Sequence, residues 1–319
     1  MVEARVRVIS DNDYCGDPDG LVQLAHHLLC PTVDMRCVIG CQVASFDIAA
    51  SSTSADASRT VAREVAALTG RPGVRVLAGS NTGLDSPEEP QTTAAATAII
   101  EEAMRDDDMP LFVACGGSLT NIASAWLLEP RIAERLTLVW IGGREYEGLA
   151  EPPPGALPVE YNTGIDLVAA QVVFNQSTIP IWQVPQDAYR QVLASRSELV
   201  LRMQESGTLG AYLFDALDRF LRQIEELGVR VGETYVLGDS PLVLLTALLS
   251  PFFPAPSSTR WVTMPRPTML DTGFYGPAAP GDHIRVVTQI DTRLLIEDLY
   301  AKLAFHARVD QGEREPAAT

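Results

Sequence analysis

The first half of the chain alternates between two hydrophobic patterns. Short runs that are apolar at nearly every position predict buried strands, and longer stretches with apolar residues three and four apart predict helices. The predicted strands are residues 6–9, 35–43, 74–77, 111–115 and 136–141. The predicted helices are residues 21–29, 54–69, 92–105 and 121–128. This alternation predicts an α/β fold, with a mainly parallel, doubly wound (Rossmann-like) open sheet flanked by helices.

The second half of the chain is less regular. Its predicted elements are helix 167–174, strand 179–184, a helical stretch 197–227 broken near Gly207, helix 241–249, strand 284–290 and helix 292–305. Residues 250–283 are rich in Pro and Gly, and a loop of that length is typical of a segment that covers a site. We interpret 1–319 as a single domain in which residues 250–283 form a site-covering loop region.

Charge restricts the ligands that this chain can bind. It has 41 Asp and Glu residues against 24 Lys and Arg residues, a net charge of −17. Such a surface repels the phosphate backbone of nucleic acids and attracts cations. No segment reaches the roughly 18 apolar residues that a membrane helix needs, so we expect neither a nucleic-acid nor a membrane partner. The five cysteines form no CxxC pair, which favours reduced thiols in a cytoplasmic protein.

The segment after the first predicted strand carries the densest chemistry. It reads Ser-Asp-Asn-Asp-Tyr-Cys-Gly-Asp-Pro-Asp-Gly, with aspartates at Asp11, Asp13, Asp17 and Asp19. Ligands of parallel sheets bind at the carboxyl ends of the strands, where this segment lies. Carboxylates this close repel one another, and a hard divalent cation with oxygen ligands would hold them together. A helix cap and an Asx-turn would account for one or two of the four.

This segment resembles the N-terminal motif of the inosine-uridine-preferring nucleoside hydrolase family, which reads D-x-D, three residues, then D-D. Asp11, Asp13 and Asp17 keep that spacing. Pro18 stands where the second aspartate of the pair is expected, and Asp19 follows one residue later. We interpret this as a one-residue insertion in which Asp19 takes over the missing ligand role.

Three further segments resemble the family in the family's order. Gly116–Ala123 is similar to a G-P-L-T-N-I-A turn whose threonine, here Thr120, offers its carbonyl to calcium. Glu-Tyr-Asn at 160–162 is similar to A-E-F-N, in which the glutamate and asparagine hold ribose hydroxyls. Gly-Asp-Ser-Pro at 238–241 is similar to H-D-P, whose aspartate, here Asp239, is the distal calcium ligand.

The resemblance implies calcium-dependent hydrolysis of the N-glycosidic bond of a ribonucleoside or related N-riboside, which releases ribose and a base. Asp13 would be the catalytic general base; the implied Ca²⁺ ligands are Asp13, Asp19, Thr120 and Asp239, and the implied ribose ligands are Asp17, Glu160 and Asn162. It also implies a homodimer or homotetramer that binds a small molecule.

The residues expected to contact the base depart from the family pattern. Gly238 stands where the family has a histidine that helps to protonate the departing base, and none of the four histidines has an obvious claim to that role. Trp261, in the predicted covering loop, is a candidate for stacking on the base. These departures favour a modified or better-leaving N-riboside, or a weak catalyst.

Two other functions are compatible with these patterns. The first is a riboside-binding protein of the same fold with little or no catalysis, which the glycine at 238 motivates. The second is a phosphotransferase with an aspartyl nucleophile, because Asp11-x-Asp13 ends a strand. The residue after Asp13 is Tyr14 rather than Thr or Val, and the single lysine is Lys302 in the last helix. Both features disfavour the phosphotransferase.

Overall fold

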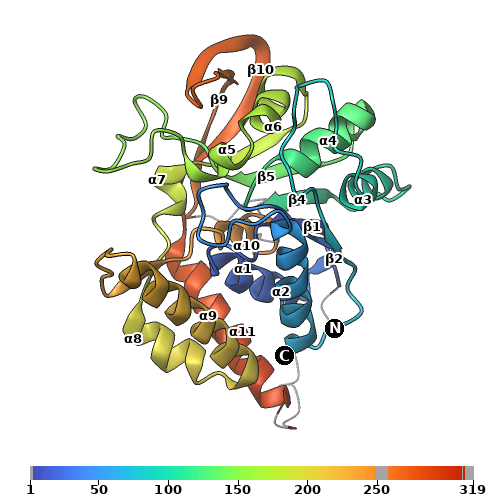
Figure 1. Cartoon of the computed structure of the whole chain (residues 1–319). Helices are drawn as coiled ribbons and strands as arrows, with labels where there is room; N and C mark the ends of the chain where they lie inside the picture. The colour runs from blue at the N-terminus through green and yellow to red at the C-terminus, as the bar shows by residue number, and fades with distance from the viewer. Residues whose placement is uncertain (1–2, 249–257, 311, 313–319) are drawn as a thin grey trace.

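An eight-stranded sheet forms the centre of the molecule, in the order β3-β2-β1-β4-β5-β6-β10-β9 (Figure 1). The structure is a computed structural model that describes residues 3–248, 258–310 and 312. The strands are β1 (Val6–Asn12), β2 (Val33–Gly40), β3 (Val76–Ala78), β4 (Leu111–Cys115), β5 (Thr137–Ile141), β6 (Ile181–Val184), β9 (Arg260–Met269) and β10 (Tyr275–Gln289). All neighbours pair in parallel except β9, which runs antiparallel to β10. The predicted α/β fold with a mainly parallel sheet is confirmed.

Alternating side chains of the central strands build two separate cores. In β1, Val8 belongs to one buried cluster and Ile9 to the other. In β4, Ala114 and Val113 divide in the same way. Successive side chains of a strand point to opposite faces of the sheet, and both faces are covered. The central strands β4 and β5 are therefore apolar at almost every position, which is the pattern that the sequence shows.

Helices form a layer on each face of the sheet (Figure 1). One layer contains α1 (Asp19–Leu28), α2 (Ser54–Leu68), α9 (Gly207–Glu226), α10 (Pro241–Thr246) and α11 (Thr292–Asp310). The other contains α3 (Ala94–Ala103), α4 (Thr120–Leu128), α6 (Leu167–Gln171) and the turn η2 (Val172–Gln176). No helix among the described residues is long and apolar enough to cross a membrane.

The remaining elements connect these layers. They are the helical turns η1 (Pro130–Glu134), α5 (Tyr161–Ile165), α7 (Gln186–Tyr189), α8 (Arg196–Glu198) and η3 (Leu199–Gln204), and the two-stranded sheet of β7 (Leu193–Ser195) and β8 (Thr234–Val236). The expected break in the helical stretch 197–227 occurs at Gly207, whose φ of +68° a side-chain-bearing residue rarely adopts.

The prediction of a loop over residues 250–283 is wrong for the part that the structure describes. Residues 260–289 form the β9–β10 hairpin at the edge of the sheet, and residues 250–257 lie outside the described residues. Pro265 and Pro267 favoured the loop interpretation, because proline has no backbone N–H to donate to a neighbouring strand. An edge strand tolerates it, since one side of the strand has no partner, and β9 is the edge strand.

A buried arginine anchors this hairpin. The Arg266 guanidinium donates to the carbonyl oxygens of Val173, Ser177 and Ile179 at 3.2, 2.7 and 2.5 Å, and its Nε lies 2.9 Å from Asp282 Oδ2. Arg266 is 2% exposed. It thus connects the edge of the sheet to the chain that leads into β6.

Replacing Arg266 with leucine should lower the free energy of unfolding by about 3 kcal/mol, because three buried carbonyls lose their hydrogen-bond donor and the Asp282 carboxylate loses its ion-pair partner. The matched control is Arg285→Leu in β10, whose guanidinium lies 4.0 Å from the Trp182 ring and 4.5 Å from the Trp261 ring. That control should lose about 1 kcal/mol. Urea unfolding of both variants measures the difference, and equal losses would contradict the anchoring role.

Candidate functional site

The polar side chains at the end of β1 lie on both faces of the sheet. Asp11 points toward α4 and accepts from Asn121 Nδ2 at 3.1 and 3.2 Å. Asn12 points the other way, where its Nδ2 donates to Asp239 Oδ2 at 2.8 Å and its Oδ1 accepts from the Asp13 amide at 2.8 Å. The alternation of a strand therefore fixes the direction of each polar side chain before the loop begins.

The starts of two helices converge on the same point. Asp19 is the first residue of α1, and Asp239 lies two residues before α10. The Asp239 amide donates to Asp19 Oδ2 at 3.0 Å. Close packing depends on a glycine here, since a Cβ at Gly20 would lie 2.9 Å from Asn12 Nδ2. Segments 220 residues apart in sequence are thus held in contact.

Two tyrosine hydroxyls hold further carboxylates at this site. Tyr235 donates to Asp17 at 2.5 Å, and Tyr161 donates to Asp47 at 2.5 Å. Asp47 follows β2 and was not anticipated from the sequence. We call Asp13, Asp17, Asp19, Asp47 and Asp239 the carboxylate cluster.

Burial and mutual repulsion shape the electrostatics of this cluster. Asp13, Asp19 and Asp239 are 6%, 8% and 5% exposed. Burial, with the charge of Asp239 next, holds the pKa of both Asp13 and Asp19 well above its usual range. Burial also raises the pKa of Asp239 to about 7, although the hydrogen bond from Asn12 lowers it. Several negative charges are therefore brought together at a cost, and a cation would relieve it.

The donors present fit a hard divalent cation. Among the described residues, none of the ion pairs involves a member of the carboxylate cluster, and Lys302 is held by Asp298 on α11. Carboxylate oxygens without a basic partner are the ligands that calcium and magnesium prefer. Among the described residues, no three carboxylates of the cluster have oxygens that all lie within 4.8 Å of one another. Such spacing is expected, because the carboxylates repel one another.

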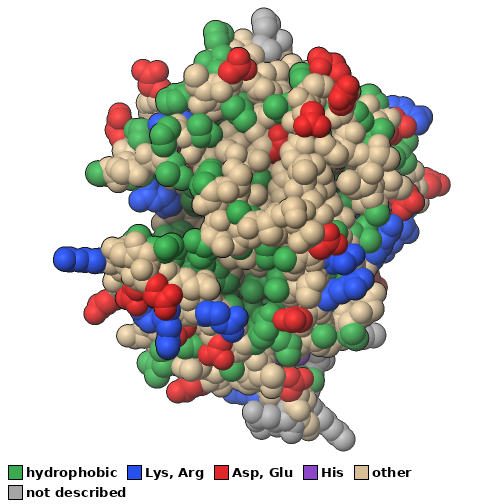
Figure 2. Space-filling view, viewed as in Figure 1, with side chains coloured by type: hydrophobic (Ala, Val, Ile, Leu, Met, Phe, Trp, Pro, Cys, Tyr) green, Lys and Arg blue, Asp and Glu red, His purple; other side chains and the backbone are tan. Residues whose placement is uncertain are grey.

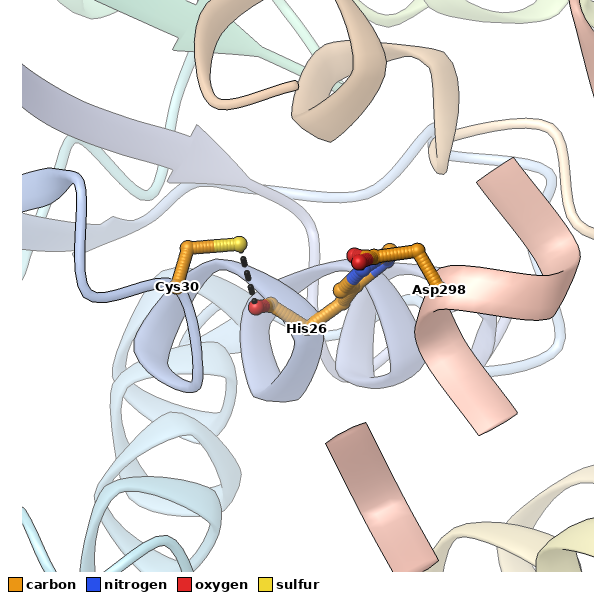
Figure 3. Close-up of side chains that lie close together, drawn as sticks. All are labelled: His26, Cys30 and Asp298. Atoms are coloured by element: carbon orange, nitrogen blue, oxygen red, sulfur yellow. Dashed lines mark hydrogen bonds and ion pairs between the residues drawn. The ribbon is translucent and has the colours of Figure 1, made fainter. Parts of the chain in front are cut away.

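A tighter group lies elsewhere, between α1 and α11 (Figure 3). Within the part of the chain that the structure describes, His26, Cys30 and Asp298 are the trio whose ligand atoms lie within 4.8 Å of one another. His26 Nε2 lies 2.7 Å from Asp298 Oδ2, which also pairs with the Lys302 ammonium. Burial raises the pKa of the Cys30 thiol to about 11. The lysine already balances the carboxylate, so this group ties two helices together.

Glu160 and Asn162 lie at the carboxyl end of β5, within extensive hydrogen bonding. Glu160 caps α5 and accepts from the amides of Gly143, Asn162 and Thr163 at 2.7, 3.2 and 3.0 Å. Its Oε1 also accepts from Tyr189 Oη at 3.1 Å. Asn162 donates through Nδ2 to the carbonyls of Gly116 and Ile141 at 3.0 and 2.8 Å, which leaves its amide oxygen to accept from a ligand.

Two predicted site residues make no recorded contact with the carboxylate cluster. Thr120 Oγ1 donates to Asp166 Oδ2 at 2.6 Å, and its carbonyl accepts from Ser124 Oγ at 2.7 Å, so its hydrogen bonds are made with α4 and Asp166. Trp261 lies on edge strand β9, separated from β1 by four strands, with its ring against the Arg285 guanidinium. The expected position of Trp261 next to a base therefore has no support in the fold.

A groove lined by both hydrophobic and charged side chains adjoins the cluster. It has a volume of about 650 Å³ and is bounded by the aspartate loop, by residues 48–49 next to Asp47, and by α2 and α9. Figure 2 shows hydrophobic side chains gathered in the hollow on this face. The ring of Phe220 in the groove lies 6.5 Å from that of Tyr235, which binds Asp17. The groove thus borders the loop that carries Asp13 and Asp17, through neighbours of these residues such as Gly16 and Pro18.

A family model gives the decisive comparison. The model of the inosine-uridine preferring nucleoside hydrolases matches residues 37–295. The chain belongs to this family. The match begins after the aspartate loop, where Asp-Pro-Asp at 17–19 departs from the paired aspartates of the nucleoside hydrolase motif.

Individual relatives and solved structures agree with this assignment. The chain is 34% identical over 137 residues to the inosine-uridine preferring nucleoside hydrolase of Leishmania major, a stretch of 41% of this chain and 40% of the relative. The Crithidia fasciculata protein of the same name is 34% identical over 133 residues, 40% of this chain and 39% of the relative. The purine-preferring ribonucleoside hydrolase from Gardnerella vaginalis has a similar fold, with a TM-score of 0.72, 17% identity, and coverage of 95% of this chain and 99% of that one.

Sequence reasoning missed Asp47 and Tyr235, and it considered Tyr189 only for stacking on the base. Each comes from a different loop or short element, and none belongs to a motif. Position after a strand was the one available signal for Asp47, because it lies in the segment that follows β2. Tyr189 and Tyr235 enter the site through tertiary packing, which no local pattern indicates.

We expect the stability of the metal-free protein to fall as pH rises from 5.5 to 7.5. Burial raises the pKa of Asp11 to about 7, so its protonated form is favoured in the folded state. Such a group contributes stability below its unfolded pKa and loses it as pH rises through the folded pKa. Over this range Asp11 alone would contribute about 2 kcal/mol.

Urea unfolding with chelator at several pH values measures this dependence. Asp11→Asn should flatten it, because the amide stays neutral, while the exposed control Asp85→Asn should not. A metal-free protein whose stability is constant or rises over this range would contradict the assignment.

Proposed function

We propose that this protein hydrolyses the N-glycosidic bond of a ribonucleoside or related N-riboside in a calcium-dependent reaction. The observation that carries the proposal is the cluster of carboxylates without a basic partner, three of them buried, at the carboxyl end of β1 in a nucleoside hydrolase chain. We also propose that the enzyme works in the cytoplasm as a homodimer or homotetramer.

Asp13, Asp19 and Asp239 are the proposed protein ligands of the ion, with the Thr120 carbonyl as a fourth. A bound divalent cation lowers the pKa of a coordinated water and fixes its position. Asp13 is the proposed general base that takes the proton of the attacking water. Its burial supports this role, because a carboxylate in a dry site is a stronger base than one in water.

The ribose side of the site is proposed to consist of Asp17, Glu160 and Asn162. Asp17 lies at the surface of the loop, and its contact with Tyr235 could be exchanged for a ribose hydroxyl. Glu160 could likewise exchange the Tyr189 hydroxyl for a ribose hydroxyl, while its three backbone donors keep it in place. Contacts that strengthen as the ring flattens would stabilise an oxocarbenium-like transition state.

The phosphotransferase is not supported by the arrangement. Such an enzyme needs a lysine for the phosphate beside its aspartates, and the single lysine of the chain is paired with Asp298. Binding without turnover is the remaining alternative.

Ribose release from a panel of N-ribosides tests the function directly. We expect turnover with calcium, none with chelator, and a loss in Asp13→Asn on the order of 100-fold or more. Tight riboside binding without ribose release, in protein that binds calcium, would instead establish a binding protein.

Calorimetric titration with calcium tests the proposed ligands. Asp13→Ala and Asp239→Ala should each abolish measurable binding, because each removes a charged ligand from a site with few. Asp271→Ala, an exposed aspartate in the β9–β10 turn, is the control and should bind as the unmodified protein does. Unchanged affinity in either cluster variant would remove that residue from the metal site.

A further inference from the structure

The leaving group determines what a riboside hydrolase must supply. When the bond between C1′ and the base nitrogen breaks, both electrons go to the base. A neutral purine or pyrimidine would leave as an anion, so it needs a proton from a nearby donor. A base that is already cationic, such as an N-linked pyridinium, takes the same electron pair and leaves neutral. The donors around the carboxylate cluster therefore limit the substrate.

Three tyrosine hydroxyls at the site donate to carboxylates: Tyr161 to Asp47, Tyr235 to Asp17 and Tyr189 to Glu160. Giving such a proton to a base would place a phenolate against a carboxylate, which is strongly unfavourable in a buried site. The Tyr14 hydroxyl pairs with Ser10, and the buried Ser240 hydroxyl beside Asp239 is an aliphatic alcohol, too weak an acid to protonate a base.

The histidines and the single lysine of the chain lie elsewhere. His26 binds Asp298, His27 binds Thr246, and His306 binds the Leu68 carbonyl. His283 is exposed on the hairpin. Lys302 is paired with Asp298. Residues 249–257 contain no titratable side chain, so none of these can provide the proton.

The groove beside the cluster has the features that recognise an aromatic cation. Its lining includes the rings of Tyr212 and Phe220 and the carboxylates of Glu64 and Glu226, with Arg219 as a single positive charge. Aromatic faces attract cations. Its volume of about 650 Å³ lies in the range of small-molecule sites, roughly 300–1,000 Å³.

We propose that the preferred substrates are cationic N-ribosides, N-ribosyl pyridiniums in particular, whose base departs as a neutral molecule into this groove. This rests on the proposed hydrolase function. The C1′–N bond breaks and its electron pair stays on the pyridine nitrogen. Water adds its oxygen to C1′, and its proton goes to Asp13 and then to solvent. No proton is delivered to the base.

Three substrates, each tested with calcium-loaded protein, separate the effect of the substrate's charge from the need for a proton donor. Nicotinamide riboside is cationic and needs no proton donor. p-Nitrophenyl riboside is neutral and needs none, because nitrophenolate is a stable anion. Inosine is neutral and needs one. We expect kcat/KM for nicotinamide riboside to exceed that for inosine by about 100-fold or more, and to fall with added salt while that for inosine does not.

Gly238 provides a matched pair of variants. A Cβ there would lie 3.3 Å from Asp19 Oδ2 and 3.3 Å from Tyr189 Cδ2, so a side chain at 238 borders the site. Gly238→His should raise kcat/KM for inosine about 10-fold or more and leave that for nicotinamide riboside unimproved. Gly238→Ala adds the Cβ alone and should change both substrates to the same extent.

The outcomes distinguish this inference from the proposed function. The proposed substrate class would be overturned, and the hydrolase function left intact, by either of two results. The first is inosine cleaved as fast as nicotinamide riboside. The second is a Gly238→His variant that binds calcium normally but cleaves inosine no faster than Gly238→Ala does. Failure to release ribose from all three substrates, p-nitrophenyl riboside included, would overturn the hydrolase itself.

Discussion

Repulsion between buried carboxylates is the constraint on which the rest of the site depends. Asp13, Asp19 and Asp239 are each less than a tenth exposed, and within the described residues no lysine or arginine pairs with them. Amide donors from Asn12 and from the Asp239 backbone offset part of the cost. They do not remove a negative charge. A divalent cation would remove it, so the proposed metal site and the proposed catalytic base would be consequences of the same arrangement.

The fold tolerates this arrangement because its helix starts converge there. Asp19 opens α1, and Asp239 lies just before α10. Unpaired amides at a helix N-terminus carry partial positive charge, which stabilises nearby carboxylates. The parallel sheet brings such N-termini to the edge where β1, β4 and β5 end. The architecture thus supplies a weak positive field before any ion is bound, and glycines such as Gly20 allow the backbones to approach.

Local patterns were sufficient for the parts of this molecule in which one segment determines its own structure. The buried strands, the break at Gly207 and the position of the aspartate loop are of this kind. The β9–β10 hairpin was missed because its prolines are tolerated only at a sheet edge, and edge position is a property of the whole sheet. Asp47 and Tyr189 reach the site through packing between distant segments. Thr120 matched a motif, yet its bonds to Asp166 and Ser124 depend on α4 and the chain before α6.

Charge connects the missing proton donor to the substrate. An anionic base would form beside Asp17 and Asp47, and more carboxylates gather here than one divalent ion neutralises. Its departure would therefore be opposed by the field as well as by the lack of a proton. The departure of a cationic base is favoured instead. The negative field of the carboxylates attracts the cationic substrate, and the base leaves as a neutral molecule that needs no proton. One feature, the concentration of acidic side chains around β1, thus favours both the metal and a positively charged riboside.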